Sequence, residues 1–577
     1  MSGIDWSILI SSLVFISVYG IYKSRGTQNT ERYLRGDNTL PWYAVGLSVM
    51  ATQASAITFL SGPGQAYTDG MRFVQFYFGL PLAMILICIF VVPVYHRLKI
   101  YTAYQFLETR FDLKTRSLAA LLFLIQRGIA SGLTIYAPAI ILSTLLGWNI
   151  YLTNIVIGGI VIIYTVTGGT KAVSYTQLPQ MAIILVGMFV AGFLLIYYLP
   201  DNVGFTEAIR IAGKMGKMNI IDVSHNFSNQ YTIWSGLIGG MFLALSYFGT
   251  DQSQVSRYLS AKSVTENKIG LLFNGLVKIP MQFSILLIGA ILFVFYLFVP
   301  VPLLFNKVEL EKVKQSVYSD EFKKVETDFN DCQRQINTIA VSTANSLRNK
   351  DDNSFVSNVE QLKIECEKRK SLKEEGIAIM KKNSATSATS DVNYIFLSYV
   401  LEYLPVGVVG LLIALVFAAS MSSTSSELNA LASTTLIDIY KRNFRTNKTD
   451  AHYLSASKWF TAGWGIYAIL VAQLSTNLGS LIEAVNKLGS YFYGTILGIF
   501  ILAFLFKRIK GSTAFYSALI AEIGVILCAV FTPVSFLWYN VIGAILVVIV
   551  AHLIQLSISS SPPSPASNQP QLFPLPL

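Results

Sequence analysis

The chain has 577 residues, of which 53% are hydrophobic and only 13% are charged, and its mean hydropathy is +0.54. Soluble domains carry about 25% charged residues, so this composition excludes an ordinary soluble protein and indicates many membrane spans. The net charge of +11 would suggest a nucleic-acid partner only if the basic residues formed one soluble patch. They are distributed among the segments between apolar runs, so we expect no nucleic acid, and the lipid bilayer becomes the first partner.

Continuous apolar runs of about 20 residues predict membrane-spanning helices rather than a β-barrel. The first run has no basic residue before it and no cleavage-site pattern after it, which predicts a retained helix rather than a signal peptide. We expect about 13 transmembrane helices in an all-α polytopic fold. They lie near 4–22, 40–66, 73–95, 117–146, 150–167, 178–199, 231–250, 268–300, 405–439, 458–474, 480–506, 512–531 and 536–556.

The basic residues predict the orientation of these spans. On one side of the membrane the connecting segments hold 21 Lys and Arg residues, whereas the short segments on the other side hold only Arg72, Arg210, Lys214 and Lys217. The positive-inside rule places the 21 in the cytoplasm. We therefore expect a plasma-membrane or inner-membrane protein with its N-terminus outside and its C-terminus in the cytoplasm.

The chain divides into six predicted regions. In chain order these are a leading helix with a cytoplasmic loop (1–39), core helices 1 to 7 (40–300), a helical insert on the outer face (301–392), core helices 8 to 10 (393–510), two peripheral helices (511–556) and a Ser/Pro-rich tail (557–577). The tail is expected to be disordered. The insert is expected to be a helical hairpin that caps the outer mouth, or alternatively binds a partner. Cys332 and Cys366 lie one on each arm, and their spacing leaves a disulfide open.

Two predicted spans are interrupted. Residues 50–67 and 247–259 combine polar side chains with glycine or proline inside apolar helices. These interruptions lie in core helices 1 and 6, at equivalent positions of two five-helix units. Secondary transporters built from inverted repeats bind ion and solute near such breaks, because the broken helices leave backbone groups without partners.

A third polar feature lies in core helix 8. Six of the seven residues from Ser420 to Ser426 carry hydroxyls. On a helix, Ala419, Ser422, Ser423 and Ser426 follow i, i+3, i+4, i+7 and share one face. Neutral oxygens on that face suit Na⁺, a hard cation of single charge. Close helix packing through small residues is the alternative.

Ionisable residues inside membrane spans mark transport pathways by default. The candidates are Arg127, Lys278, Lys487, Asp251, Glu427, Glu483 and Glu522. Glu483 and Lys487 could instead form a structural i, i+4 pair, and Glu522, on a peripheral helix, favours a structural role. The sequence shows no evident arginine clamp for an anionic solute.

Six motifs resemble the sodium/solute symporter family. They are SAITFLSGPGQAY, KIYTAYQFLETRFD, IYAPA, YTVTGGTKAVSYTQ, GTDQSQVSRYLSAKS and MSSTSSELNALAS. Their phrasing is similar to the monocarboxylate, multivitamin and iodide branch more than to the glucose branch. The resemblance covers nearly the whole chain apart from the insert and the tail. It implies the leucine-transporter-type fold, with five-plus-five inverted repeats.

The resemblance also implies site residues. The implied Na⁺ ligands are the carbonyls of Ala51, Ala54 and Ala419 and the hydroxyls of Ser422 and Ser423. The implied substrate-facing residues are Thr58, Tyr77, Tyr247, Phe248, Asp251, Gln252 and Asn486. Gln177 stands where the family often has an acid that helps bind a second Na⁺, and Ser425 and Ser426 are the other residues that could contribute to that ion. A second ion is therefore in doubt.

Together these features predict a Na⁺-coupled symporter that imports a small polar organic solute by alternating access. A sodium-coupled sugar transporter is the alternative to a monocarboxylate, vitamin or anion transporter. A solute sensor on the same fold is an alternative of another class. An ion channel is disfavoured because no charged ring or repeated carbonyl-rich filter is evident, and no motif suggests an enzyme.

Overall fold

The computed structural model describes residues 1–24, 40–384, 389–476 and 478–559. Within these ranges the chain is almost entirely helical, and extended pairing is limited to an isolated bridge between Leu40 and Ala261. The predicted cytoplasmic loop falls largely on residues 25–39, and most of the predicted tail on 560–577. Both predictions therefore lie outside the described residues.

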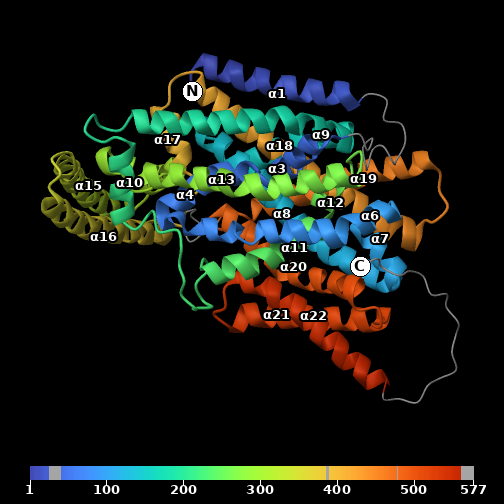
Figure 1. Cartoon of the computed structure of the whole chain (residues 1–577). Coiled ribbons are helices and arrows are strands. Elements are labelled where there is room, and N and C mark those ends of the chain that lie inside the picture. Colours follow the sequence, from blue (N-terminus) through green and yellow to red (C-terminus); the bar gives the residue numbers. More distant parts are fainter. Residues whose placement is uncertain (25–39, 385–388, 477, 560–577) are drawn as a thin grey trace.

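The helices run in roughly parallel layers across the molecule (Figure 1). The first half comprises α1 (Gly3–Ser24), α3 (Trp42–Gln53), α4 (Ala56–Asp69), η1 (Met71–Tyr77), α5 (Leu80–Leu86), η2 (Ile87–Val91), α6 (Val92–Leu98), α7 (Ala103–Arg110), α8 (Leu113–Leu146), α9 (Ile150–Tyr197), α10 (Phe205–Lys214), η3 (Ser235–Gly239), α11 (Gly240–Gly249), α12 (Gln252–Tyr258) and α13 (Val264–Phe298). The second half comprises α14 (Lys307–Lys314), α15 (Ser319–Arg348), α16 (Asp352–Asn383), α17 (Ile395–Tyr403), α18 (Val408–Thr434), η4 (Thr435–Phe444), α19 (Asp450–Gln473), α20 (Leu481–Leu505), α21 (Gly511–Phe531) and α22 (Phe536–Ser559).

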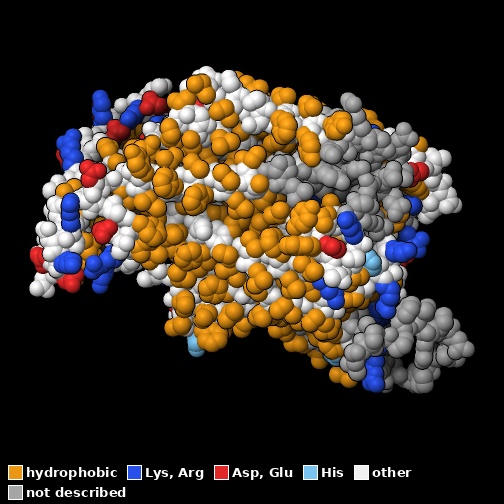
Figure 2. Space-filling view, turned by 45° about the horizontal axis from the view of Figure 1, so that its top comes forward, with side chains coloured by type: hydrophobic (Ala, Val, Ile, Leu, Met, Phe, Trp, Pro, Cys, Tyr) orange, Lys and Arg blue, Asp and Glu red, His pale blue; other side chains and the backbone are white. Residues whose placement is uncertain are grey.

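The described helices include nine that are long and apolar enough to cross a membrane, or ten if the bent pair α3–α4 forms one span. Two shorter apolar helices, Gly3–Ile16 and Ser235–Gly249, fall in further predicted spans. The remaining predicted span, 458–474, lies in α19 except for its last residue. Each of the 13 predicted segments thus contains helix. Figure 2 shows hydrophobic side chains over the middle of the molecule, with charged side chains gathered toward its ends.

Both predicted breaks are present. Helices α3 and α4 meet at Ala54 and Ser55 with a bend of 62°. Helix α11 stops at Gly249, and α12 starts after Asp251, whose carboxylate accepts a hydrogen bond of 2.9 Å from the backbone N–H of Ser253. This capping satisfies one of the free N–H groups at the start of a helix, so the second break is fixed by a side chain of its own.

Helix α9 carries two predicted spans. The hydroxyls of Tyr164 and Thr176 lie 3.0 Å apart. Twelve residues of straight helix advance by about 18 Å along the axis, so α9 is not straight between these two residues. The first half packs on α19 and the second on α18, as Gly158 approaches Ile469 and Gly187 approaches Leu415.

The leading helix is attached to core helix 8. The carboxylate of Asp5 accepts hydrogen bonds from the backbone N–H groups of Gly407, at 2.7 Å, and Gly410, at 3.0 Å. A Cβ at position 410 would lie 2.5 Å from the Asp5 carbonyl oxygen, so glycine permits this close approach. These bonds cap the start of α18 and fix α1 against it.

The insert forms a helical hairpin, α15 and α16, at one end of the molecule (Figure 1). Its own small core includes Leu310, Phe322 and Phe329. The Gln333 amide donates to the carbonyls of Tyr296 and Val299, both at 3.1 Å, which fastens the hairpin to the end of α13.

The cysteines of the hairpin are not joined. Cys332 and Cys366 are both free, and the Cys332 thiol donates to the backbone carbonyl of Glu365 at 3.4 Å. The disulfide that the sequence left open between the two arms is thus absent, and both cysteines are thiols.

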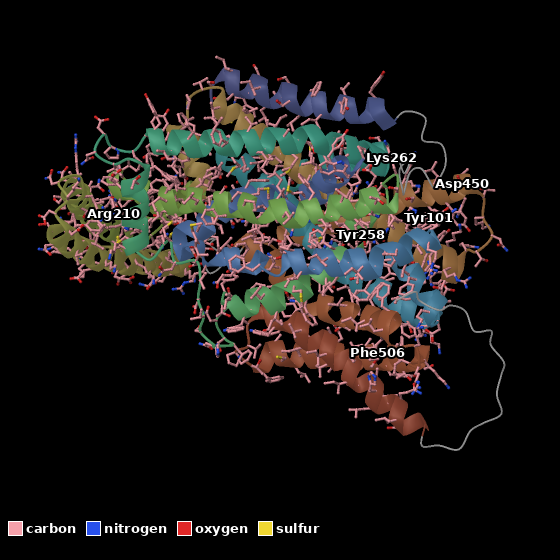
Figure 3. The ribbon with its side chains drawn as sticks, viewed as in Figure 1. Tyr101, Arg210, Tyr258, Lys262, Asp450 and Phe506 are labelled. Carbon is pink, nitrogen blue, oxygen red and sulfur yellow. The ribbon has the colours of Figure 1, made fainter. Side chains whose placement is uncertain are left out.

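Residues of the two predicted faces lie at opposite ends of the molecule. Figure 3 shows Tyr101, Lys262 and Asp450 toward one end and Arg210 at the other. Lys262 belongs to the predicted cytoplasmic set and Arg210 to the outer set. Helix α1 begins toward the end that carries the insert, and α22 ends toward the other (Figure 1). The orientation of these two ends relative to the membrane stays a prediction.

Candidate functional site

A cavity of about 70 Å³ lies beside the break in core helix 1. Its walls come from α3, α4, η1, α8, α11, α18 and α20. Ligand pockets usually measure about 300–1,000 Å³, and one water in the liquid takes about 30 Å³. The cavity in this conformation therefore holds little more than water, and an organic solute enters only if the surrounding helices move apart.

Four of the predicted substrate-facing residues line this cavity: Thr58, Tyr77, Tyr247 and Asn486. They come from four different helices, and the fold brings them together although they are far apart in sequence. That they contact the solute stays a prediction.

The other three predicted residues are placed elsewhere. Phe248 is fully buried, with its ring centroid 4.9 Å from that of Tyr247. The Gln252 amide accepts from the N–H of Ala103 at 3.0 Å and donates to the carbonyl of Tyr101 at 2.9 Å. It therefore ties α12 to the start of α7. Asp251 pairs with Arg127.

The predicted sodium residues meet where the helix break faces α18. Ala51, Ala54, Ala419, Ser422 and Ser423 are at most 3% exposed. The Ser423 hydroxyl lies 3.5 Å from the carbonyl oxygen of Ala51, which connects the two helices directly. The buried Ser422 hydroxyl has no hydrogen-bond partner.

A small cation suits this place. A buried polar atom without a partner is costly, and the oxygen of Ser422 is of the hard type that Na⁺ prefers. Among the described residues, no three His, Cys, Asp or Glu side chains are grouped so that they could hold a metal ion. The donor set at the break is therefore neutral oxygen, which fits a monovalent ion better than a divalent one.

Gln177 lies close to this place, between α3 and α18. Its amide oxygen accepts from the Ser48 hydroxyl, and its amide nitrogen donates to Thr52 at 3.1 Å and Ser426 at 3.2 Å. The hydroxyl of Ser425 instead donates to the carbonyl of Ser422 at 3.0 Å. The –NH₂ group of Gln177 thus uses the hydroxyl oxygens of Thr52 and Ser426, which an additional cation would need.

The cavity contains an arginine, although the sequence shows no evident arginine clamp. Arg127, on α8, lines the cavity and is 2% exposed. Its guanidinium pairs with Asp251 and Glu427 and donates to the Tyr493 hydroxyl at 2.5 Å. These contacts join α8, the start of α12, α18 and α20. The sequence marks the three charged residues as intramembrane, but no nearby residue indicates that they pair with one another.

Polar contacts tie core helix 1 to core helix 10 on the insert side of the cavity. The Glu483 carboxylate accepts from Tyr231 at 2.5 Å and from Gln65 at 3.1 Å. Asn393, just after the insert, accepts from Ser61 at 2.7 Å and donates to the carbonyl of Gly479 at 2.8 Å. Glu483 thus bonds other helices, beyond the local pair with Lys487 that was considered from the sequence.

The opposite end is held by ion pairs. Arg116 pairs with Glu108 at 2.5 Å and with Asp438 at 2.7 Å, and Arg442 also pairs with Glu108. These contacts join α7, α8 and η4. In this conformation the cavity is thus bounded by polar contacts toward both ends.

Comparison with known proteins identifies the family to which the chain is similar. The family model "Sodium:solute symporter family" matches residues 33–310 and 371–521, and the gap falls within the insert. A sodium/sialic acid symporter of Proteus mirabilis is 24% identical over 95% of this chain and 93% of its own length. The human sodium/iodide cotransporter is 31% identical over 47% of this chain and 42% of its own. The sodium-coupled monocarboxylate transporter 1 of Xenopus laevis is 25% identical over 88% and 68%.

A solved structure of a Na⁺-coupled sialic acid symporter in an outward-open state is similar, with a TM-score of 0.74 and 23% identity over 96% of this chain and 98% of its own. That similarity confirms the leucine-transporter-type fold. The family match covers well over half of the chain. This multi-pass membrane protein therefore belongs to the sodium:solute symporter family.

Proposed function

We propose that the protein imports a small polar organic solute by alternating access, with Na⁺, the coupling ion of its family, bound between the break in core helix 1 and α18. The observation that carries the Na⁺ site is the partnerless hydroxyl of Ser422 beside the contact between Ser423 and Ala51. An ion there would hold the broken helix against α18. Coupling requires that Na⁺ bind the outward and inward states with different affinity.

The orientation follows from the basic residues. The end with Lys262 faces the cytoplasm, and the insert faces outward. Na⁺ then binds from the outside, and the solute leaves inward after the ion is lost to a sodium-poor cytoplasm. The contacts of Glu483 on one side of the cavity and of Arg116 on the other are the interactions that must open in turn.

The number of ions per cycle follows from Gln177. Its amide is neutral and already bonds the hydroxyls of Thr52 and Ser426. A second Na⁺ would have to displace that amide and would gain no negative charge in return. We therefore infer a single Na⁺ per transport cycle.

The relatives span several solute classes: sialic acid, iodide and monocarboxylate. The sialic acid symporters support a sugar-like solute as the leading alternative to a monocarboxylate or vitamin. A solute sensor on the same fold would bind solute without moving it. Thermal-shift screening against a solute panel, with and without Na⁺, followed by uptake of the best binder into proteoliposomes, separates transport from sensing. Solute binding without uptake would contradict the proposed function.

A further inference from the structure

One guanidinium and two carboxylates cluster at the cavity, and two of the three residues, Arg127 and Glu427, line it. Arg127, Asp251 and Glu427 are each at least 95% buried and lie within direct bonding distance of one another through Arg127. If all three are ionised, the cluster carries one surplus negative charge. A buried charge without compensation is costly, so the cluster favours a positive partner, which is either a bound proton or a cationic group of a ligand.

The two carboxylates differ in how many of their hydrogen-bond acceptor positions are occupied. Asp251 accepts two bonds from Ser253 on one oxygen, at 2.9 and 2.6 Å. Its other oxygen accepts from the guanidinium of Arg127 and, at 3.0 Å, from the Tyr493 hydroxyl. Asp251 does not line the cavity, and its bonding capacity is taken up by the protein. It therefore neutralises the charge of Arg127 without contacting the cavity.

Glu427 lines the cavity, and only some of its hydrogen-bond acceptor positions are occupied. One oxygen accepts from Arg127 at 3.1 Å and the other from the Thr134 hydroxyl at 2.9 Å. A carboxylate offers about four acceptor positions, so about two remain. These are available to a group that enters the cavity.

A second acceptor in the same cavity has no hydrogen-bond donor. The buried side-chain oxygen of Gln53, at the end of α3, lines the cavity and has no hydrogen-bond partner. Gln53 and Glu427 belong to different helices, so this is independent of the charge count. Both observations indicate a ligand that brings N–H donors.

Arg127 itself has little capacity left for an anion. It donates from Nε to Asp251, from Nη1 to Glu427 and from Nη2 to both Asp251 and Tyr493. These four interactions engage most of its five N–H groups. A carboxylate solute would have to displace a buried carboxylate already bound and would add a second surplus negative charge. The other buried base nearby, Lys278, lies 5.7 Å from the Tyr77 ring and is not among the lining residues.

We propose that the transported solute carries an ammonium group, which binds Glu427 and Gln53 in the cavity walled by Tyr77 and Tyr247. This inference rests on the transport function proposed above and names its solute class: a cationic or zwitterionic amine. The relatives described by name include carriers of anions, and Arg127 alone would suggest the same here. The two carboxylates bound to Arg127 reverse that expectation.

The test compares solutes of similar size whose charged group differs. One matched set is ethanolamine, ethylene glycol and glycolate, and a larger set is glucosamine, glucose and glucuronate. Thermal unfolding of the purified full chain is measured with each compound in saturating Na⁺. The amine of at least one set should raise the unfolding temperature, and its neutral and carboxylate counterparts should not. Stabilisation by a carboxylate, or by no amine, would overturn the proposal.

Two variants assign the effect to the cavity. Glu427→Gln removes the surplus charge while it keeps the size of the side chain, and should weaken amine binding at least tenfold, as expected for a lost charge-assisted hydrogen bond. Glu522→Gln is the matched control, because Glu522 is a mostly buried carboxylate on peripheral helix α21. It should keep the wild-type response. Equal amine affinity in wild type and Glu427→Gln would refute the assignment.

The Na⁺ dependence is read separately in the same experiment. If Na⁺ stabilises the protein but the carboxylates bind best, the solute class is wrong and the symporter function stands. If Na⁺ has no effect on unfolding with or without any solute, the proposed function itself fails.

Discussion

Replacement of Ser422 by alanine should separate sodium binding from fold stability. The hydroxyl of Ser422 is buried and has no partner in the protein. Such a group costs about 1–3 kcal/mol of stability when it is left unsatisfied. Ser422→Ala removes that cost, so the sodium-free protein should be as stable as wild type or more stable. The same change removes a predicted ligand of the ion.

The loss of sodium affinity can be estimated from the contact that disappears. An interaction between a polar group and a charge contributes about 1.5–3 kcal/mol. Since about 1.4 kcal/mol corresponds to a factor of ten in affinity, Ser422→Ala should raise the half-saturating Na⁺ concentration by about 10- to 100-fold. Ser423→Ala should act in the same direction. It should also lower stability slightly, because Ser423 has a contact of its own, at 3.5 Å to Ala51.

The assay is thermal unfolding across a Na⁺ titration, with K⁺ holding the ionic strength constant. Ser420→Ala is the matched control, because Ser420 lies in the same serine run and donates to the carbonyl of Thr134 at 2.8 Å. It should lose about 0.5–1.5 kcal/mol at every Na⁺ concentration and keep the wild-type midpoint. An unchanged midpoint in both Ser422→Ala and Ser423→Ala would refute the sodium site and leave the helix-packing interpretation.

Two further predictions concern stoichiometry and the insert. Charge-to-solute measurements in proteoliposomes should give one Na⁺ per cycle, and two Na⁺ per solute in wild type would contradict the role assigned to Gln177. The variant Gln177→Asp should steepen the dependence of uptake on Na⁺ concentration, because it creates an anionic site among Ser48, Thr52 and Ser426. Replacement of residues 306–390 by a flexible linker should keep Na⁺-dependent uptake measurable, with reduced expression. The ring centroids of Phe305 and Tyr296 stay 5.2 Å apart, and Asn393 keeps its bonds to Ser61 in α4 and to Gly479, just before α20. Lost uptake in a variant that reaches the membrane and binds solute would show that the hairpin takes part in gating.

The features that the sequence predicts well are local or periodic. The break at Ala54 and Ser55 is signalled by polar residues and glycines inside an apolar run, because such residues interrupt a helix within a few positions. The shared face of Ser422 and Ser423 follows from helical spacing alone. Their meeting with Ala51 comes from the family resemblance, and the structure places Ser423 against that residue.

Long-range pairing is what the sequence could not supply. Arg127 and Glu427 are 300 positions apart, and nothing near either one indicates its partner. For the same reason the sequence marks Arg127 as an intramembrane charge but does not place it in the cavity. Gln252 shows the opposite case: it is polar and lies at a helix break, yet its amide binds the backbone of Tyr101 and Ala103. A polar residue in a span can thus serve the fold or the cavity, and only the tertiary arrangement distinguishes the two.

Uptake driven by a Na⁺ gradient tests the central claim most directly. The solute with the largest Na⁺-dependent thermal shift is added to proteoliposomes with high Na⁺ outside and none inside. Symport predicts accumulation above the equilibrium level, which collapses when Na⁺ is equalised and is lost at the same gradient in Ser423→Ala. Uptake that reaches the same level with and without the gradient would contradict the claim.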